Sequence, residues 1–177
     1  MAMLKRYVLT GGPGCGKTSI LTGLEMRGEL VVREAARDYY LLERARGIVA
    51  PTELDSFEAE ILRLHLMRER AIPTEGRARV FLDRGVYDHF VYGRLVGKHI
   101  PRSLARQARR CATYSIAFLV EPLGGQWSEP VGYTGLRPEE LHQAIGEEYA
   151  ALGIKVIPIA PAPLDNRVEA VLGHVHG

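Results

Sequence analysis

One glycine-rich stretch constrains this chain more than any other feature. The sequence "VLTGGPGCGKTS" at residues 8–19 places four glycines, a lysine and a threonine directly after a short apolar run. Glycines let the main chain curl so that successive N–H groups converge on an anion, and a helix beginning there adds its partial positive charge. The stretch therefore predicts a strand, a phosphate-binding loop and a helix, in that order.

The loop has the full spacing G-x-x-x-x-G-K-[ST]. We expect its backbone N–H groups to bind the phosphates of ATP, Lys17 to reach the β- and γ-phosphates, and Thr18 to ligate Mg²⁺. The alternative, a glycine-rich turn that matches by chance, is disfavoured by the strand before it and the helix after it. Cys15 is expected to pack rather than to act as a redox switch. The predicted nucleotide-binding residues are Gly11, Gly12, Pro13, Gly14, Cys15, Gly16, Lys17, Thr18 and Ser19.

Apolar strands alternate with helical segments along the chain, which is typical of an α/β fold whose parallel sheet is covered on both faces. Ligands bind such sheets at the carboxyl ends of the strands, so polar residues just after strands are candidate site residues. We expect strands at residues 6–10, 29–34, 79–83, 114–120 and 154–160, and helices at 18–27, 35–47, 85–94 and 101–110.

A further helix is predicted to begin at Thr52, where Asp55 three residues later completes a capping box. Apolar residues then recur at the spacing of an amphipathic helix with one buried face. This apolar stripe consists of Leu54, Phe57, Ile61 and Leu64.

Composition places the chain among globular proteins, with 177 residues, 46% hydrophobic and 25% charged. This length predicts one domain over residues 1–177. We expect no membrane span and no signal peptide, and therefore a cytoplasmic location. Two cysteines predict no disulfide framework. The net charge of only +2 argues against nucleic acid as a partner, and the basic stretch 101–110 is best explained as a solvated helix face.

Charged residues follow the second and third predicted strands. Asp83 ends the run "VFLD", where a carboxylate holds Mg²⁺ through water, and Arg84 beside it would face the transferred phosphate or the acceptor. Glu34 could accept a proton from an attacking hydroxyl, and Arg37, one turn on, could hold a substrate anion. The alternatives are an Asp–Arg pair that caps a strand end and a Glu34–Arg37 surface pair; for Glu34 and Arg37 the two interpretations are even.

Two further features could serve the acceptor. Asp88 and Tyr92 share a helix face and could line its pocket, although solvated-face and core roles are equally compatible with the spacing. The segment 121–138 is rich in glycine and proline, and a loop of this length favours a lid that excludes water, with Arg137 neutralising phosphoryl charge. A plain surface loop is the alternative.

These stretches together resemble the P-loop kinases of the nucleoside and nucleotide kinase group. The runs "REAARD" and "FLDRGVYDHFVYGRL" resemble, more closely, a family of small ATPases related to the kinase domain of bacterial NAD-regulator/ribosylnicotinamide kinase proteins. The resemblance implies a three-layer P-loop fold with a five-stranded parallel sheet in the order 2-3-1-4-5 and a lid loop. It also implies a base role for Glu34, a catalytic role for Arg84 and an acidic site position at Asp88. The lid sequence here is "TGLR", without the aspartate usual in that family.

The expected activity is transfer of the γ-phosphoryl group of Mg-ATP to a small acceptor, a nucleoside, nucleotide or related metabolite. Lys17, Glu34, Arg84 and Arg137 are the expected catalytic residues, and Thr18 and Asp83 the expected Mg²⁺ residues. The alternative is a nucleotide-dependent ATPase or switch that acts with a protein partner. The identity of the acceptor and the oligomeric state are not readable from the sequence.

Overall fold

The computed structural model describes residues 4–73, 76, 78–125 and 135–175. Its sheet has five strands in the order β2-β3-β1-β4-β5, which confirms the order that the resemblance implied. Every neighbouring pair is parallel. The strands are β1 (Lys5–Thr10), β2 (Val31–Val32), β3 (Arg79–Asp83), β4 (Ile116–Val120) and β5 (Lys155–Ile159).

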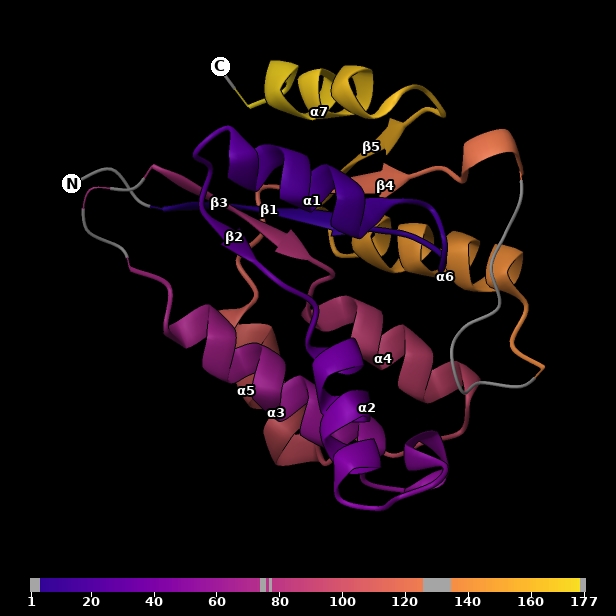
Figure 1. Cartoon of the computed structure of the whole chain (residues 1–177). Coiled ribbons are helices and arrows are strands. Elements are labelled where there is room, and N and C mark those ends of the chain that lie inside the picture. The colour runs from indigo at the N-terminus through magenta and orange to yellow at the C-terminus, as the bar shows by residue number, and fades with distance from the viewer. Residues whose placement is uncertain (1–3, 74–75, 77, 126–134, 176–177) are drawn as a thin grey trace.

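Helices cover both faces of this sheet (Figure 1). The helices α1 and α7 pack together on one face, α3, α4, α5 and α6 lie on the other, and α2 packs on α3 rather than on the sheet. In the described residues the α-helices are α1 (Lys17–Met26), α2 (Ala35–Ala45), α3 (Phe57–Arg70), α4 (Val86–Leu95), α5 (Arg102–Cys111), α6 (Pro138–Ala151) and α7 (Leu164–Gly173), with 3₁₀ turns at Pro51–Glu53 and Leu123–Gly125.

Alternation along β1 supplies both layers of the core. Val8 packs into the cluster under α3 to α6, whereas Tyr7 and Leu9 pack into the cluster under α1 and α7. Successive side chains of a strand point to opposite faces, so a strand that is apolar over consecutive residues, as β1 is from Tyr7 to Leu9, must be covered on both faces.

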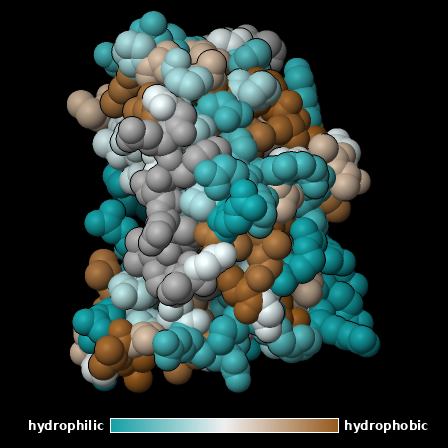
Figure 2. Space-filling model, turned by 90° about the vertical axis from the view of Figure 1, so that its right-hand side faces the viewer, coloured by the Kyte–Doolittle hydropathy of each residue, from teal (hydrophilic) through white to brown (hydrophobic). Residues whose placement is uncertain are grey.

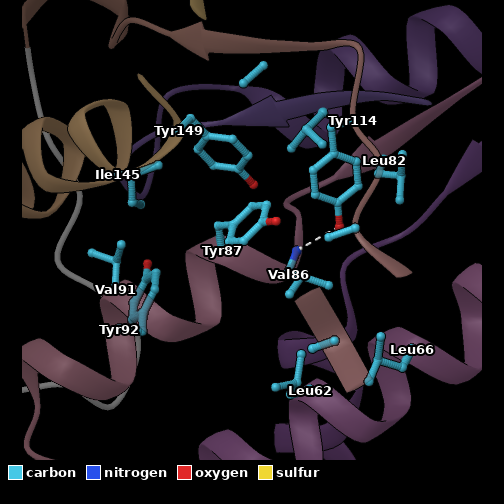
Figure 3. Close-up of a cluster of buried hydrophobic side chains, with 14 of the residues drawn as sticks. Leu62, Leu66, Leu82, Val86, Tyr87, Val91, Tyr92, Tyr114, Ile145 and Tyr149 are labelled. Carbon is cyan, nitrogen blue, oxygen red and sulfur yellow. Dashed lines mark hydrogen bonds between the residues drawn. The ribbon is translucent and has the colours of Figure 1, made fainter. Parts of the chain in front are cut away.

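Three tyrosines organise the layer beneath α4 and α6 (Figure 3). The rings of Tyr87, Tyr114 and Tyr149 meet with centroids 5.6 to 6.3 Å apart. The Tyr114 hydroxyl accepts a hydrogen bond from the backbone N–H of Val86 at 2.9 Å, which fixes the first turn of α4. A Cβ on Gly85 would lie 2.4 Å from the Tyr149 hydroxyl, so only glycine fits between β3 and α4 here.

The predicted amphipathic helix is present as α3, but its predicted beginning at Thr52 was wrong. Residues Pro51–Glu53 form a 3₁₀ turn, Leu54 is extended, and α3 begins only at Phe57 after Ser56. The extended backbone at Leu54 turns the chain so that Phe57 and Ile61 pack against α2 in a separate small cluster. Contact with α2, which a local capping signal cannot report, sets where this helix begins.

The second strand is also shorter than the predicted 29–34. Only Val31 and Val32 pair with β3, and Glu34 occupies the N-cap position of α2. The carboxyl ends of the strands nevertheless meet at one side of the sheet, where the loops after β1, β2 and β3 come together. Figure 2 views this side, on which hydrophobic and hydrophilic side chains are mixed. Within the described residues, none of the helices combines the length and the apolar character needed to cross a membrane.

Candidate active site

A cleft of about 580 Å³ lies at the carboxyl ends of the strands, a volume ordinary for a small-molecule site. One end is the glycine loop, and the other is built from α2, α3 and α4. The residues that line it are Pro13, Gly14, Gly16, Lys17, Thr18, Glu34, Ala36, Arg37, Tyr40, Leu41, Thr52, Phe57, Glu58, Ile61, Arg84, His89 and Tyr92.

The loop has the backbone that its glycines predicted. Gly11, Gly14 and Gly16 have φ values of 121°, 76° and 87°, a region that residues with a side chain rarely adopt. The Lys17 ammonium, almost fully buried, donates hydrogen bonds to the carbonyl oxygens of Gly11 at 3.1 Å and Gly12 at 2.6 Å. Burial, reinforced by the nearby Arg84 guanidinium, lowers the pKa of Lys17 to about 8. The lysine is thus held inside the loop, where phosphates would bind.

Cys15 packs within the loop, as predicted. Its thiol is fully buried and donates to the Gly12 carbonyl oxygen at 3.0 Å. Burial raises the pKa of this thiol, which keeps it protonated and unreactive at neutral pH.

Thr18 lines the cleft and contacts Asp83, which is buried and does not itself line it. The Thr18 hydroxyl donates to Asp83 Oδ2 at 2.6 Å, and the buried Oδ1 of Asp83 has no hydrogen-bond partner. Burial and the Glu34 carboxylate raise the pKa of Asp83, so a cation beside it would stabilise its charged form. A hydroxyl and a carboxylate fit Mg²⁺, which takes few protein ligands and completes its shell with phosphate and water oxygens. The described residues hold no group of three or more His, Cys, Asp or Glu suited to a metal, so a cage made by protein alone is not present there.

Glu34 and Arg84 form an ion pair between the two ends of the cleft. Arg84 Nε lies 2.6 Å from Glu34 Oε1, and its guanidinium stacks over the Tyr92 ring with a centroid distance of 5.0 Å. Burial by itself raises the pKa of Glu34, but Arg84 and Lys17 outweigh this and leave its pKa lowered. Glu34 is therefore ionised at neutral pH.

The backbone of Arg84 is strained. Its φ of 69° is the one positive φ outside glycine among the described residues, and such a conformation costs about 1–3 kcal/mol. Its side chain is almost fully buried, and its Nη1 lacks a hydrogen-bond partner although it lies 3.7 Å from Asp88. Strain of this kind gathers at functional sites, because the surrounding structure must hold the residue in place.

The structure does not place Asp88 in the lining of the cleft. Its carboxylate is fully buried and accepts hydrogen bonds from the Thr10 hydroxyl at 2.6 Å, the Tyr149 hydroxyl at 2.6 Å and the Gly85 N–H at 3.0 Å. Three donors converge on its two oxygens, so Asp88 ties β1, α4 and α6 together behind Arg84. Tyr92, on the same helix face, does line the cleft.

The two other predicted arginines differ in position. Arg37 is exposed, lines the cleft and lies near enough to Glu34 to help lower its pKa. Arg137 is the N-cap residue of α6, is exposed and pairs with Glu140 at 2.9 Å, away from the cleft lining. Half of the lid candidate 121–138, namely residues 126–134, lies outside the described residues.

Sequence reasoning missed the residues that support the loop from behind. Arg167 of α7 donates to the carbonyl oxygens of Cys15 at 2.8 Å and Glu121 at 2.7 Å. His142 of α6 accepts from the Gly12 N–H at 3.2 Å, and its other ring nitrogen lies 3.3 Å from the Glu121 carboxylate. No local pattern marks these residues, because each acts on a loop more than 100 positions away.

The acceptor half of the cleft was missed as well. Aromatic and aliphatic side chains from α2, α3 and α4 form most of its wall, together with three buried polar residues, Thr52, Glu58 and His89. The apolar members, Tyr40, Leu41, Phe57, Ile61 and Tyr92, come from three helices and carry no shared spacing in the sequence.

The fold and the loop define the class of protein. A parallel sheet in the order 2-3-1-4-5, with a glycine loop after its central strand and an Asp–Arg pair after the next one, is a kinase-like P-loop domain. A family described as an AAA domain matches residues 6–167, and the chain belongs to this family. No curated protein matches the chain.

Solved structures show the same fold at low sequence identity. NadR protein in complex with NR has a TM-score of 0.72 and 18% identity, over 98% of this chain and 50% of that chain. NadR in complex with NAD and AMP-PNP gives 0.70 and 19%, over 97% and 49%. Deoxyadenosine kinase from M. mycoides with bound dATP gives 0.63 and 10%, over 98% and 100%. The chain thus spans about half the length of the NadR chains and the whole of the deoxyadenosine kinase.

Proposed function

We propose that this protein transfers the γ-phosphoryl group of Mg-ATP to a hydroxyl or phosphate of a small acceptor, a nucleoside, nucleotide or related metabolite. The observation that carries the proposal is the position of the Glu34–Arg84 pair. It lies where a glycine loop suited to phosphates meets a cleft walled by aromatic side chains. A hydrolase needs a place for ATP and water only, whereas this cleft continues beyond the glycine loop into an apolar half that can accommodate a second substrate.

The loop residues hold the donor. Backbone N–H groups of residues 11–18 would bind the phosphates, and Lys17 would leave the carbonyl oxygens of Gly11 and Gly12 to contact the β- and γ-phosphates. Thr18 and Asp83 would hold Mg²⁺, with the unpaired Asp83 Oδ1 as a ready acceptor of bound water. When bound, the ion supplies neutralisation of phosphate charge.

Glu34 acts on the acceptor. Its ionised carboxylate takes the proton of an acceptor hydroxyl while that oxygen bonds to the γ-phosphorus and the bond to the ADP oxygen breaks. Arg84 holds Glu34 in place and offers its Nη1, which has no hydrogen-bond partner, to the charge that gathers on the transferred group. Arg37, at the exposed edge, is suited to an anionic part of the acceptor. The role of Arg137 as a lid arginine stays a prediction.

The test is ADP formation from Mg-ATP with each member of a panel of nucleosides, nucleotides and ribosylnicotinamide, with the product identified by mass. We expect one acceptor class to raise ADP formation steeply. In the Glu34→Gln variant the turnover number should fall about 10²- to 10⁴-fold while ATP still binds, because the base is lost but the loop is not. Glu169→Gln, an exposed change of the same kind on α7, is the matched control.

Two results would contradict the proposal. Transfer at the wild-type rate by Glu34→Gln would remove Glu34 from the role of base. Slow hydrolysis that no acceptor accelerates would instead favour the alternative, a nucleotide-dependent ATPase or switch in which Glu34 positions water. Binding assays against candidate protein partners, with and without ATP, would then follow.

A further inference from the structure

His89 stands out among the residues that line the acceptor half of the cleft. It lies in the first turns of α4, is 3% exposed, and its Nε2 is buried with no hydrogen-bond partner. Leaving a buried polar nitrogen unpaired costs about 1–3 kcal/mol, so such a group on a residue that lines a cleft calls for a functional explanation.

A polar network holds the His89 ring in place. The His65 ring packs edge-on against it with centroids 5.1 Å apart, and His65 Nε2 lies 2.8 Å from Glu69 Oε1. The same carboxylate oxygen accepts a hydrogen bond from the Tyr114 hydroxyl at 2.6 Å. Tyr114 in turn accepts from the N–H of Val86, at the start of the helix that carries His89. The network therefore fixes the His65 ring, which contacts the imidazole, and the start of α4, which carries it.

His89 is uncharged in this setting. Burial first, and then the neighbouring His65 and Arg84, lower the pKa of His89 well below its ordinary value. A neutral imidazole can donate or accept one hydrogen bond at Nε2 without bringing a charge into the cleft. It therefore suits an uncharged polar group of a ligand rather than a phosphate.

The other side chains in the acceptor half of the cleft suit a flat ring of a ligand. Phe57 is fixed by Tyr39, with ring centroids 5.5 Å apart, and lies with Tyr40 and Tyr92 in the cleft wall. Aromatic side chains pack well against planar rings of a ligand, in stacked or edge-on arrangements. At the other end, Glu34 and Arg84 are suited to a hydroxyl near the donor phosphates.

We propose that His89 is a specificity-determining residue of the acceptor site, where its imidazole forms a hydrogen bond with the polar edge of an uncharged planar base. The acceptor class is then the nucleosides, and His89 selects those whose base carries a hydrogen-bonding group at that point. This inference rests on the proposed phosphoryl transfer and adds what the acceptor must look like.

Matched pairs of nucleosides test it, each pair differing by one polar group of the base. Adenosine is compared with purine riboside, guanosine with inosine, and cytidine with pyrimidin-2-one riboside, each with Mg-ATP. A site built around a hydrogen bond rejects the analogue that lacks it, so wild-type kcat/KM should favour the polar member of at least one pair by about tenfold or more. In His89→Leu we expect this preference to fall to within about twofold, mainly through the acceptor KM, with the KM for ATP unchanged.

Two variants serve as controls. His89→Gln keeps an N–H near the position of Nε2 and should restore most of the preference. His99→Leu makes the same chemical change at an exposed position outside the cleft and should leave all constants unchanged. Should His89→Leu fail to fold, His89→Phe keeps a flat ring without nitrogen and takes its place.

The outcomes separate this inference from the proposed function. Transfer to nucleosides with the same preference in His89→Leu as in the wild type would overturn the inference alone. The same holds if both members of every pair lose activity by one factor, which is the mark of a structural role, or if the wild type prefers neither member of any pair. If the wild type phosphorylates nucleotides but no nucleoside, the inference fails and phosphoryl transfer stands. If it phosphorylates no acceptor at all, both fail.

Discussion

The two ends of the cleft are built in opposite ways. The phosphate end uses backbone atoms from one continuous stretch, residues 11–18, whose glycines and lysine follow each other at fixed spacing. The acceptor end uses side chains that α2, α3 and α4 bring together from positions 34 to 92. A loop that binds a constant group can be encoded locally, whereas a pocket that selects among acceptors depends on how helices pack.

The glycine loop is not built by local sequence alone, because two residues from distant helices support it from behind. Arg167 and His142 reach that loop from α7 and α6, so even the local end depends on distant residues. Three predictions test how far the contrast holds, in order of decreasing expected effect.

Arg167→Met should weaken ATP binding about ten- to hundredfold, since it removes two hydrogen bonds from a charged donor, each worth about 1.5–3 kcal/mol, and part of that loss falls on the loop. The measurement is ATP affinity by isothermal titration calorimetry. Arg167→Lys keeps the charge, but one ammonium cannot span the Cys15 and Glu121 carbonyl oxygens as the guanidinium does, so it should recover little affinity. Wild-type affinity in Arg167→Met would mean that the loop does not need Arg167 to hold its shape.

Asp88→Asn should lower the free energy of unfolding by about 1–3 kcal/mol. An amide replaces one carboxylate oxygen by a donor, so the hydroxyls of Thr10 and Tyr149 and the Gly85 N–H cannot all be accepted. Urea unfolding measures this change in the free energy of unfolding. The second readout is the KM for the acceptor, measured at a temperature where the variant is folded. A large change in that KM with unchanged stability would make Asp88 a residue of the acceptor site after all.

ATP affinity should fall as pH rises above about 8, by at most about tenfold per pH unit. Phosphates favour the charged form of Lys17, whose pKa before binding is about 8, so at higher pH the Lys17 amine must take up a proton as the nucleotide binds. Below that pH the lysine is already charged and the effect vanishes. Titration calorimetry between pH 7 and 9 measures this, and Lys17→Arg, which stays charged, should show no such slope. A flat profile in the wild type would place the pKa of Lys17 above this range.

Much of the fold was predictable. The strand 79–83 was predicted with its exact bounds, and the first and fifth strands and the helix after the glycine loop came within one residue of their observed bounds. These elements have strong local signals, namely apolar runs bounded by glycines or polar residues. The beginning of α3 and the length of β2 were missed, because contact with α2 and pairing with β3 decide them.

In the candidate site, too, some residues were predictable from the sequence, whereas their arrangement depended on the tertiary structure. Glu34 and Arg84 were predicted separately, each after its own strand, and the order of the sheet places β2 beside β3 so that the two side chains meet at 2.6 Å. For Asp88 the spacing left an acceptor-pocket, a solvated-face and a core role open, and its three hydrogen bonds place it in the core. His89, the next residue along α4, lines the cleft, and nothing in its neighbourhood in the sequence distinguishes it.

The sequence by itself determined the phosphate loop, since glycine spacing controls the backbone directly and the lysine and threonine follow at positions that the loop brings to one point. It also determined the central strands, whose unbroken apolar runs require cover on both faces. Only the tertiary structure decided the acceptor half, the strained Arg84 and the support that Arg167 gives to the loop. The reason is that burial, charge pairing and hydrogen-bond partners depend on residues far apart in the chain, and these become neighbours only when the helices pack on the sheet.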